Sequence, residues 1–305
     1  MQTQIQQAVE QISTLILGKQ QEVRLALTCL LAGGHLLIED LPGMGKTTLS
    51  HALAQVFGLN FSRIQFTSDL LPADMLGVNI FDNQQQSFRF HPGPIFSQVV
   101  LADEINRASP KTQSALLEAM EEHQVSLDGK THHLPEPFFV IGTQNPVHQA
   151  GTYPLPESQL DRFLMRVQLG YPNWQAEKKM LQQPQADRSV RLKQVIDIQQ
   201  LLRLQQHLGK IHASEGILDY ILRLVTFSRE SDLFANALSP RASKAILQAA
   251  RSWALLHERD YLIPEDIQAV LPAVAEHRLR AALAEHQSKS SLSRQLLEHV
   301  DPLAA

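Results

Sequence analysis

A ten-residue segment near the N-terminus constrains the fold of this chain more than any other. Residues 39–48 read Glu-Asp-Leu-Pro-Gly-Met-Gly-Lys-Thr-Thr, with an apolar run at 36–38 before them and the helix-forming Leu49 and Leu53 after them. A strand, a tight glycine turn and a helix N-terminus in this order bring backbone N–H groups to one point, where the helix dipole adds positive potential. The segment therefore predicts a phosphate-binding loop.

The residue types in this loop suit a nucleoside triphosphate with its magnesium ion. Lys46 supplies a point charge for the terminal phosphates, and the hydroxyl of Thr47 can ligate Mg²⁺. Asp40 departs from the usual pattern, which has glycine five residues before Gly45. A chance Gly-Lys-Thr in a surface loop is the alternative, and the flanking strand and helix disfavour it. The predicted nucleotide-binding residues of the loop are Pro42, Gly43, Met44, Gly45, Lys46, Thr47 and Thr48.

Composition excludes several classes of protein. The 305 residues are 44% apolar and 19% charged, which is typical of a globular chain long enough for two domains. A net charge of −4 without a long basic run argues against nucleic acid as the main partner. Cys29 is the single cysteine, so no disulfide framework forms, and the thirteen histidines show no metal-ligand spacing. The N-terminus lacks a signal peptide and no apolar stretch spans a bilayer, so we expect a cytoplasmic protein without membrane insertion.

The pattern of apolar residues predicts an α/β core followed by helices. Residues 1–32 have helical spacing with a break at Gly18. Apolar runs that predict strands of a parallel sheet, buried on both faces, fall at 36–38, 64–66, 99–102, 138–141 and 163–169. After residue 172 the strand signal ends and helical periodicity takes over. We therefore expect an α/β nucleotide-binding domain at 1–172 and a helical domain at 173–305, with a polar C-terminal segment from about 284.

Two of the expected strands end in polar residues that suit phosphate chemistry. Asp103 and Glu104 follow the run at 99–102, where buried carboxylates are costly unless a cation or water uses them. Asp103 is placed to hold Mg²⁺ in its second shell, and Glu104 to polarise an attacking water. Asn145 follows the run at 138–141 and should reach the same sheet edge, where it could align that water. An acidic turn and a loop-capping asparagine are the alternatives for the isolated residues.

Two arginines lie where an anion would explain them. Arg162 opens the last expected strand of the core. Arg241 falls in the first turn of a helix that Ser239 caps and Pro240 begins, and the helix dipole disfavours a cation there. A phosphate bound between the two domains would compensate that charge, whereas a solvated arginine is the alternative.

In order and spacing, these motifs resemble the MoxR family of AAA+ ATPases. The resemblance runs from residue 16 to about 277, and its most specific segments are 63–72, 91–95, 103–108 and 153–157. It implies an AAA+ core with a helical lid, and ATP hydrolysis with Mg²⁺. Relatives that read Glu-Asp-x-Pro-Gly carry the same aspartate as Asp40, so the resemblance implies an intact phosphate loop.

The resemblance also implies roles for individual residues. Leu17 and Gly18 match the segment that packs on adenine, and Asn145 matches sensor 1. Arg162 matches the arginine finger offered to the neighbouring subunit's ATP, and Arg241 matches sensor 2 of the lid. Arg107 could also act across the interface, and the sequence does not decide between Arg107 and Arg162.

The implied assembly is a homo-oligomer, expected as a hexameric ring, that remodels or matures a partner protein or inserts a metal cofactor. The resemblance implies a separate partner with a von Willebrand A domain, whose Asp-x-Ser-x-Ser motif this chain lacks. An ATP-dependent regulatory switch or scaffold is the main alternative, and a helicase-like role is disfavoured by the charge. Two insertions, at about 75–94 and at 124–135, would face the ring pore or a partner, or remain solvated loops. Asp128 and Gly129 predict a hairpin turn in the second.

Overall fold

Five parallel strands form the central sheet of the chain. The structure is a computed structural model that describes residues 2–145, 151–182, 192–282 and 291–302. The strands are β1 (His35–Glu39), β2 (Phe61–Gln65), β5 (Val99–Asp103), β8 (Phe139–Gln144) and β9 (Phe163–Val167), in the spatial order β2-β5-β8-β1-β9. All four neighbouring pairs are parallel. The predicted α/β class and all five predicted strands are thus confirmed.

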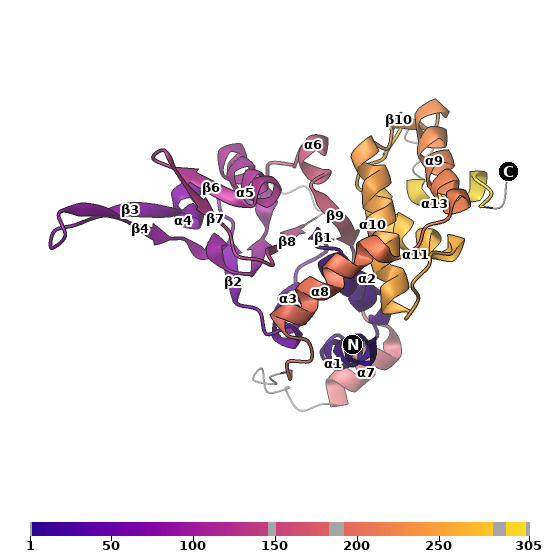
Figure 1. Cartoon of the computed structure of the whole chain (residues 1–305), viewed down its shortest axis with the longest axis horizontal. Helices are drawn as coiled ribbons and strands as arrows, with labels where there is room; N and C mark the ends of the chain where they lie inside the picture. The colour runs from indigo at the N-terminus through magenta and orange to yellow at the C-terminus, as the bar shows by residue number, and fades with distance from the viewer. Residues whose placement is uncertain (1, 146–150, 183–191, 283–290, 303–305) are drawn as a thin grey trace.

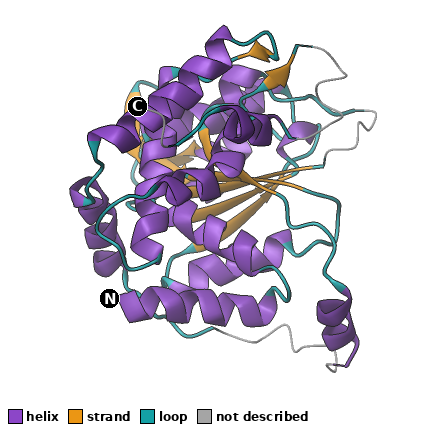
Figure 2. Cartoon of the chain, turned by 90° about the vertical axis from the view of Figure 1, so that its right-hand side faces the viewer, coloured by secondary structure: helices purple, strands orange, loops and turns teal. Residues whose placement is uncertain are grey.

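The sheet is buried on both faces because its strands are continuous apolar runs. Leu36 and Ile38 of β1 point into one core, whereas Leu37 between them points into the other. Figure 2 shows the sheet standing between helices. On the side of Leu36, α1 (Gln2–Leu15), α2 (Gln20–Leu31) and α3 (Lys46–Val56) supply buried residues to the core. On the side of Leu37, α5 (Pro110–Glu122) does so.

The helical part of the chain shares the first of these cores. Its helices are α7 (Trp174–Gln182), α8 (Ile198–His207), α9 (Glu215–Glu230), α10 (Pro240–Leu256), α11 (Pro264–Ala275) and α13 (Leu292–His299). Helix α10 lies along α2, where the Ser252 hydroxyl donates to the Thr28 carbonyl at 2.7 Å. The expected absence of strands after residue 172 was wrong, because β10 (Phe234–Asn236) and β11 (Arg280–Ala281) form a short antiparallel pair. The domain boundary at 172 remains a prediction.

Both insertions of the core are β-hairpins. The first follows α4 (Pro72–Leu76) and pairs β3 (Gly77–Asp82) with β4 (Ser87–Pro92), and the second pairs β6 (Gln124–Leu127) with β7 (Lys130–His133). They contact one another through Asn79 and Asp128, 2.6 Å apart, and through the stacked rings of Phe90 and His132. In Figure 1 the β3–β4 hairpin reaches away from the sheet on the side opposite α9 and α13.

Four short helical turns complete the elements of the described residues. They are α6 (Glu157–Leu160) and the 3₁₀ turns η1 (Pro94–Phe96), η2 (Ile105–Arg107) and η3 (Leu208–Lys210).

Cys29 is fully buried in α2, as a small apolar residue would be, and burial raises the pKa of its thiol far above the usual range. Within the described part of the chain, no helix has both the length and the apolar character needed to cross a membrane.

Candidate nucleotide-binding site

The phosphate loop connects the carboxyl end of β1 to the N-terminus of α3. Gly43 and Gly45 take φ values of +84° and +88°, which side chains strongly disfavour, so the turn requires glycine at both positions. Apart from Gly43 itself and its two chain neighbours, nothing lies within 4 Å of the position that a Cβ on Gly43 would occupy, which leaves the loop open to a ligand. Lys46 is the first residue of α3, and Thr47 and Thr48 lie exposed in its first turn. The predicted order of strand, glycine turn and helix N-terminus is therefore present in the fold.

Lys46 lies folded back against its own loop. Its ammonium donates to the carbonyl of Asp40 at 2.7 Å. Partial burial lowers the pKa of Lys46, while the carboxylates of Asp103, Asp40 and Glu104 oppose that shift. A phosphate in the loop would offer this cation a stronger partner than the carbonyl it contacts here.

Asp40 has a structural role that explains its departure from the loop pattern. Its side chain is buried, and its two carboxylate oxygens accept hydrogen bonds from the backbone N–H groups of Leu41 at 2.9 Å and Gly170 at 2.6 Å. Glycine could make neither bond. Asp40 therefore joins the phosphate loop to the segment that leads from β9 towards α7.

A cavity of about 220 Å³ adjoins the loop on the side of the N-terminal helices. Leu17 lines it, as do Gly43, Met44, Gly45 and Thr48 of the loop. Gly18 has a φ of +73° and lies against Asn173 and Ala176, so it lets the chain turn closely past the start of α7. The structure thus places Leu17 and Gly18 where a base attached to a loop-bound phosphate could pack. Pro172 and Met180 extend the apolar lining from the segment around α7.

The carboxylate of Asp103 is held by two neighbouring strands. Thr143 of β8 donates its hydroxyl to Oδ1 at 2.6 Å. From β2, the guanidinium of Arg63 donates to Oδ2 through Nη2 at 2.6 Å and through Nε at 3.2 Å. Both oxygens of Asp103 are therefore occupied within the chain.

Glu104 lies beside Asp103 on a strained turn. Its φ of +57° is left-handed, which is uncommon outside glycine and often found at functional sites. Its N–H donates to the Thr143 hydroxyl at 2.8 Å, so Thr143 holds both acidic residues. The Oε2 atom of Glu104 accepts from Gln65 at 3.1 Å and from Arg107 at 3.0 Å. Arg107 therefore contacts the carboxylate of its own chain.

Asn145 directly follows β8, which lies between β1 and β5. Because the strands are parallel, its position shares the carboxyl edge of the sheet with the phosphate loop and Glu104. The preceding residue, Gln144, accepts the Asp40 N–H through its carbonyl at 3.1 Å. The structure thus brings the predicted Asn145 to the predicted edge.

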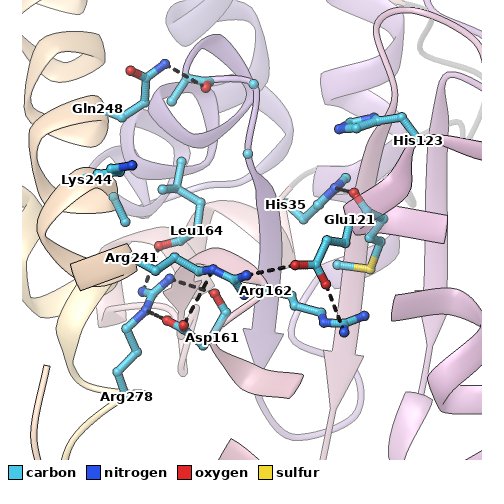
Figure 3. A pocket seen from close by; sticks show the side chains of 15 residues that line it. His35, Glu121, His123, Asp161, Arg162, Leu164, Arg241, Lys244, Gln248 and Arg278 are labelled. Carbon is cyan, nitrogen blue, oxygen red and sulfur yellow. Dashed lines mark hydrogen bonds and ion pairs between the residues drawn. The ribbon is translucent and has the colours of Figure 1, made fainter. Parts of the chain in front are cut away.

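The two predicted arginines lie together at the other edge of the sheet. Arg162 precedes β9, and its Nη2 lies 2.9 Å from Oε2 of Glu121, at the end of α5. Arg241 binds the second oxygen of the same carboxylate at 2.8 Å, and its Nε is 3.9 Å from Asp161. Figure 3 shows both guanidinium groups converging on Glu121. Within one chain, Arg241 therefore does not reach the phosphate loop, and the anion expected beside it is supplied by carboxylates rather than by a phosphate.

These arginines line a cleft of about 510 Å³ between the sheet and α10. Arg278 lies at its base, buried, and donates to Asp161 at 2.6 Å and to the Phe163 carbonyl at 2.8 Å. Burial lowers the pKa of Arg278, and the hydrogen bond to Asp161 counteracts the shift. Lys244 of α10 adds another cation to the lining. The cleft therefore favours an anionic ligand.

The residues of these sites that were not predicted from the sequence include Arg63, Gln65, Glu121 and Arg278. Arg63 and Gln65 are two residues apart on β2 and therefore point to the same side of the strand. This spacing was the signal available in the sequence. Glu121 and Arg278 gave no such signal, because an acidic helix end and an isolated arginine are common on protein surfaces.

The residues at the carboxyl edge fit magnesium bound together with a nucleotide. Among the described residues, no group of three or more histidine, cysteine or acidic side chains could hold a metal by itself. Magnesium is usually held by one or two protein oxygens together with phosphate oxygens. The exposed Thr47 hydroxyl and the Asp103 carboxylate supply such oxygens beside the phosphate loop.

Comparison with known proteins places this arrangement among ATPases. Residues 35–165 match the ATPase family associated with various cellular activities, and residues 226–298 match the AAA lid domain. Chaperone MoxR1 of Mycobacterium tuberculosis is 40% identical, covering 97% of this chain and 81% of its own. Protein YeaC of Bacillus subtilis, described as uncharacterized, is 48% identical over 89% of this chain and 85% of its own.

Protein MoxR of Methylorubrum extorquens is 30% identical, covering 88% of this chain and 85% of its own. A crystal structure from Cytophaga hutchinsonii, which carries a provisional ATPase description, superposes with a TM-score of 0.89 at 33% identity and covers 98% of this chain and 95% of its own.

Proposed function

This chain belongs to the MoxR family of AAA+ ATPases, and we propose that it hydrolyses ATP within a head-to-tail oligomer and uses the cycle to remodel or mature a partner protein. The observation that carries the proposal is the separation of the two halves of a catalytic site. The phosphate loop lies at the carboxyl edge of the sheet, whereas Arg162 and Arg241 lie at the amino edge.

The proposed reaction is attack of water on the terminal phosphate of ATP. Lys46, together with backbone N–H groups of the loop, binds the phosphates, and Leu17 and Gly18 pack beside the base. Glu104 polarises the water and Asn145 aligns it. Magnesium, when bound with ATP, neutralises charge on the phosphate oxygens, and Thr47 and Asp103 would hold it.

Arg162 and Arg241 complete the site of the neighbouring subunit in this proposal. A five-residue strand spans roughly 15 Å, so the two sheet edges are too far apart for one chain to supply both halves. The pairing with Glu121 keeps both guanidinium groups together and on the rim of a cleft that favours anions. The terminal phosphate of a neighbour's ATP is an anion that fits these donors. Arg107, which contacts Glu104 of its own chain, is the weaker candidate for this trans role.

Mixing two inactive variants tests the trans arrangement. Lys46→Ala removes the phosphate-binding cation, and Arg162→Ala removes the donated arginine. Each variant alone should have almost no ATPase activity. A mixture should recover part of it, because some interfaces combine an intact loop with an intact Arg162. Native mass spectrometry verifies that mixed oligomers form, and it also gives the ring size, which we propose is six. If such mixed oligomers recover no ATPase activity, the proposal is contradicted.

From the family resemblance, we propose that the partner is a separate protein with a von Willebrand A domain. The protein that the oligomer remodels has to be identified by experiment. Glu104→Gln should bind ATP without hydrolysing it and so hold the engaged state. A pull-down with this variant in ATP, compared with Lys46→Ala as a control that cannot bind, should enrich the partner. If Glu104→Gln supports growth of a deletion strain as well as the natural chain does, the regulatory-switch alternative gains instead.

A further inference from the structure

We propose that Arg63 is a positioning residue that occupies the metal-binding carboxylate of Asp103 in the absence of magnesium and thereby sets the magnesium dependence of nucleotide binding. The inference rests on the proposed nucleotide site. Arg63 lies on β2, outside both the phosphate loop and the acidic end of β5.

The contact between Arg63 and Asp103 has the geometry of a specific pair. Two N–H groups of one guanidinium donate to a single oxygen, Oδ2, at 2.6 and 3.2 Å. The Asp103 side chain is nearly buried, with 11% exposed, so the interaction is poorly screened by water. The other oxygen stays with Thr143, which orients the carboxylate independently of Arg63. Arg63 therefore contacts the one oxygen that is available to a cation entering the site.

Arg63 is placed to leave when another cation arrives. Its own side chain is 49% exposed, so water can solvate the guanidinium once it releases Asp103. Magnesium carries twice the charge of a guanidinium and keeps several bound waters, which could donate to the Asp103 oxygen that Arg63 releases, so it would be the stronger partner in the presence of phosphate. Without magnesium, Arg63 compensates the negative charge that would otherwise repel the phosphates of the nucleotide.

A second contact connects this exchange to the catalytic carboxylate. The Nη2 atom of Arg63 also donates to Oε1 of Gln65 at 2.7 Å, and Gln65 donates through Nε2 to Glu104 at 3.1 Å. Movement of Arg63 away from Asp103 therefore changes the hydrogen bonding of Gln65. Magnesium arrival and the position of Glu104 are coupled through two side chains of one strand.

The test measures binding of a fluorescent ATP analogue in magnesium and in EDTA. Arg63→Gln should weaken binding in EDTA, because Asp103 then faces the phosphates uncompensated, while binding in magnesium stays close to that of the natural chain. The ratio of the two dissociation constants should rise roughly tenfold, the size expected for loss of one hydrogen bond to a charged group. Arg89→Gln, which removes an arginine from β4, is the matched control and should leave the ratio unchanged.

Two further variants make the result specific. Arg63→Lys keeps the charge but loses the second donor, so it should move the ratio in the same direction by less, and it serves if Arg63→Gln does not fold. In an Asp103→Asn background, Arg63→Gln should have no further effect on the ratio. An unchanged ratio in folded Arg63→Gln and Arg63→Lys, with the natural chain binding normally, would overturn the inference. Failure of the natural chain to bind nucleotide would instead overturn the proposed function.

Discussion

The carboxylate of Asp40 accepts the backbone N–H of Gly170 at 2.6 Å, and this single bond joins two distant parts of the nucleotide site. Asp40 belongs to the phosphate loop, whereas Gly170 follows the last strand of the sheet and precedes the segment with Pro172 and Met180 that lines the cavity beside the loop. The geometry of the loop therefore depends on the position of the chain after β9.

Asp40→Ala should both destabilise the chain and weaken ATP binding. The substitution leaves the N–H groups of Leu41 and Gly170 without their acceptor, at a cost of about 1–3 kcal/mol each if they stay out of water. Thermal unfolding and nucleotide titration measure the two effects. Asp232→Ala, at an exposed position, is the control, and equal behaviour of the two variants would refute the role of Asp40.

Arg162→Ala should separate binding from turnover. The phosphate loop lies at the other edge of the sheet, so the dissociation constant for ATP should stay within about twofold of its natural value, which corresponds to less than 0.5 kcal/mol. Turnover should fall by roughly 10³ or more if the arginine acts on the neighbour's phosphate. Equilibrium binding and steady-state hydrolysis on the same preparation check both numbers. Normal turnover by an assembled Arg162→Ala oligomer would show that Arg162 is not the arginine that acts on the neighbour's phosphate.

Glu121→Ala should convert the arginine pair into an anion site within the single chain. Removal of the shared carboxylate leaves Arg162 and Arg241 facing each other without their common counter-ion. The variant should therefore melt at a lower temperature than the natural chain in dilute buffer. Sulfate should raise the melting temperature of the variant by several degrees more than it raises that of the natural chain, as expected for a ligand bound only by the folded state. Glu118→Ala, on an exposed face of the same helix, should show no such difference.

Because His35 is buried, the folded chain should lose stability in mild acid. This histidine is buried at the start of β1, where Nδ1 accepts the Val140 N–H at 3.0 Å and Nε2 lies 3.2 Å from the Met120 carbonyl. Burial lowers the pKa of His35 from 6.5 to about 4, so between these values the unfolded chain binds a proton that the folded chain does not.

The free energy of unfolding should accordingly fall as the pH drops from 6.5 towards 4, with a slope of at most about 1.4 kcal/mol per pH unit from this residue. Above pH 6.5 its contribution should be constant. Denaturant unfolding across this range measures the slope, and His35→Gln should reduce it. A slope that is the same in His35→Gln would assign the acid sensitivity to other groups, such as the buried His277, whose pKa burial also lowers.

The core of the fold could be predicted because its signals are local. Apolar runs gave all five strands of the sheet, and the loop around Lys46 fixed the order of strand, turn and helix. Ser239 and Pro240 correctly gave the start of α10, with Ser239 accepting the Ala242 N–H at 3.1 Å. The turn at Asp128 and Gly129 correctly gave the β6–β7 hairpin.

The contacts that decide how the site is held could not be predicted in the same way. Glu121 meets Arg241 across 120 positions of the chain, and Arg63 meets Asp103 across 40. Such pairs depend on the three-dimensional packing of elements and leave no periodic trace in the sequence. The strands β10 and β11 escaped prediction for a related reason, because elements of three and two residues are too short for an alternating pattern to stand out.

The opposite placement of the phosphate loop and the arginine pair gives the chain a direction. If Arg162 and Arg241 act on the neighbour's nucleotide, as proposed, a symmetric pair related by a two-fold axis would leave both sites incomplete, because a rigid subunit cannot present two opposite edges to the same neighbour. Under this proposal only repeated head-to-tail contact completes every site, and an open row of subunits ends in one unused loop and one unused arginine pair. Hydrolysis per subunit should therefore rise with protein concentration until the row closes on itself, which makes assembly itself the first control on the activity.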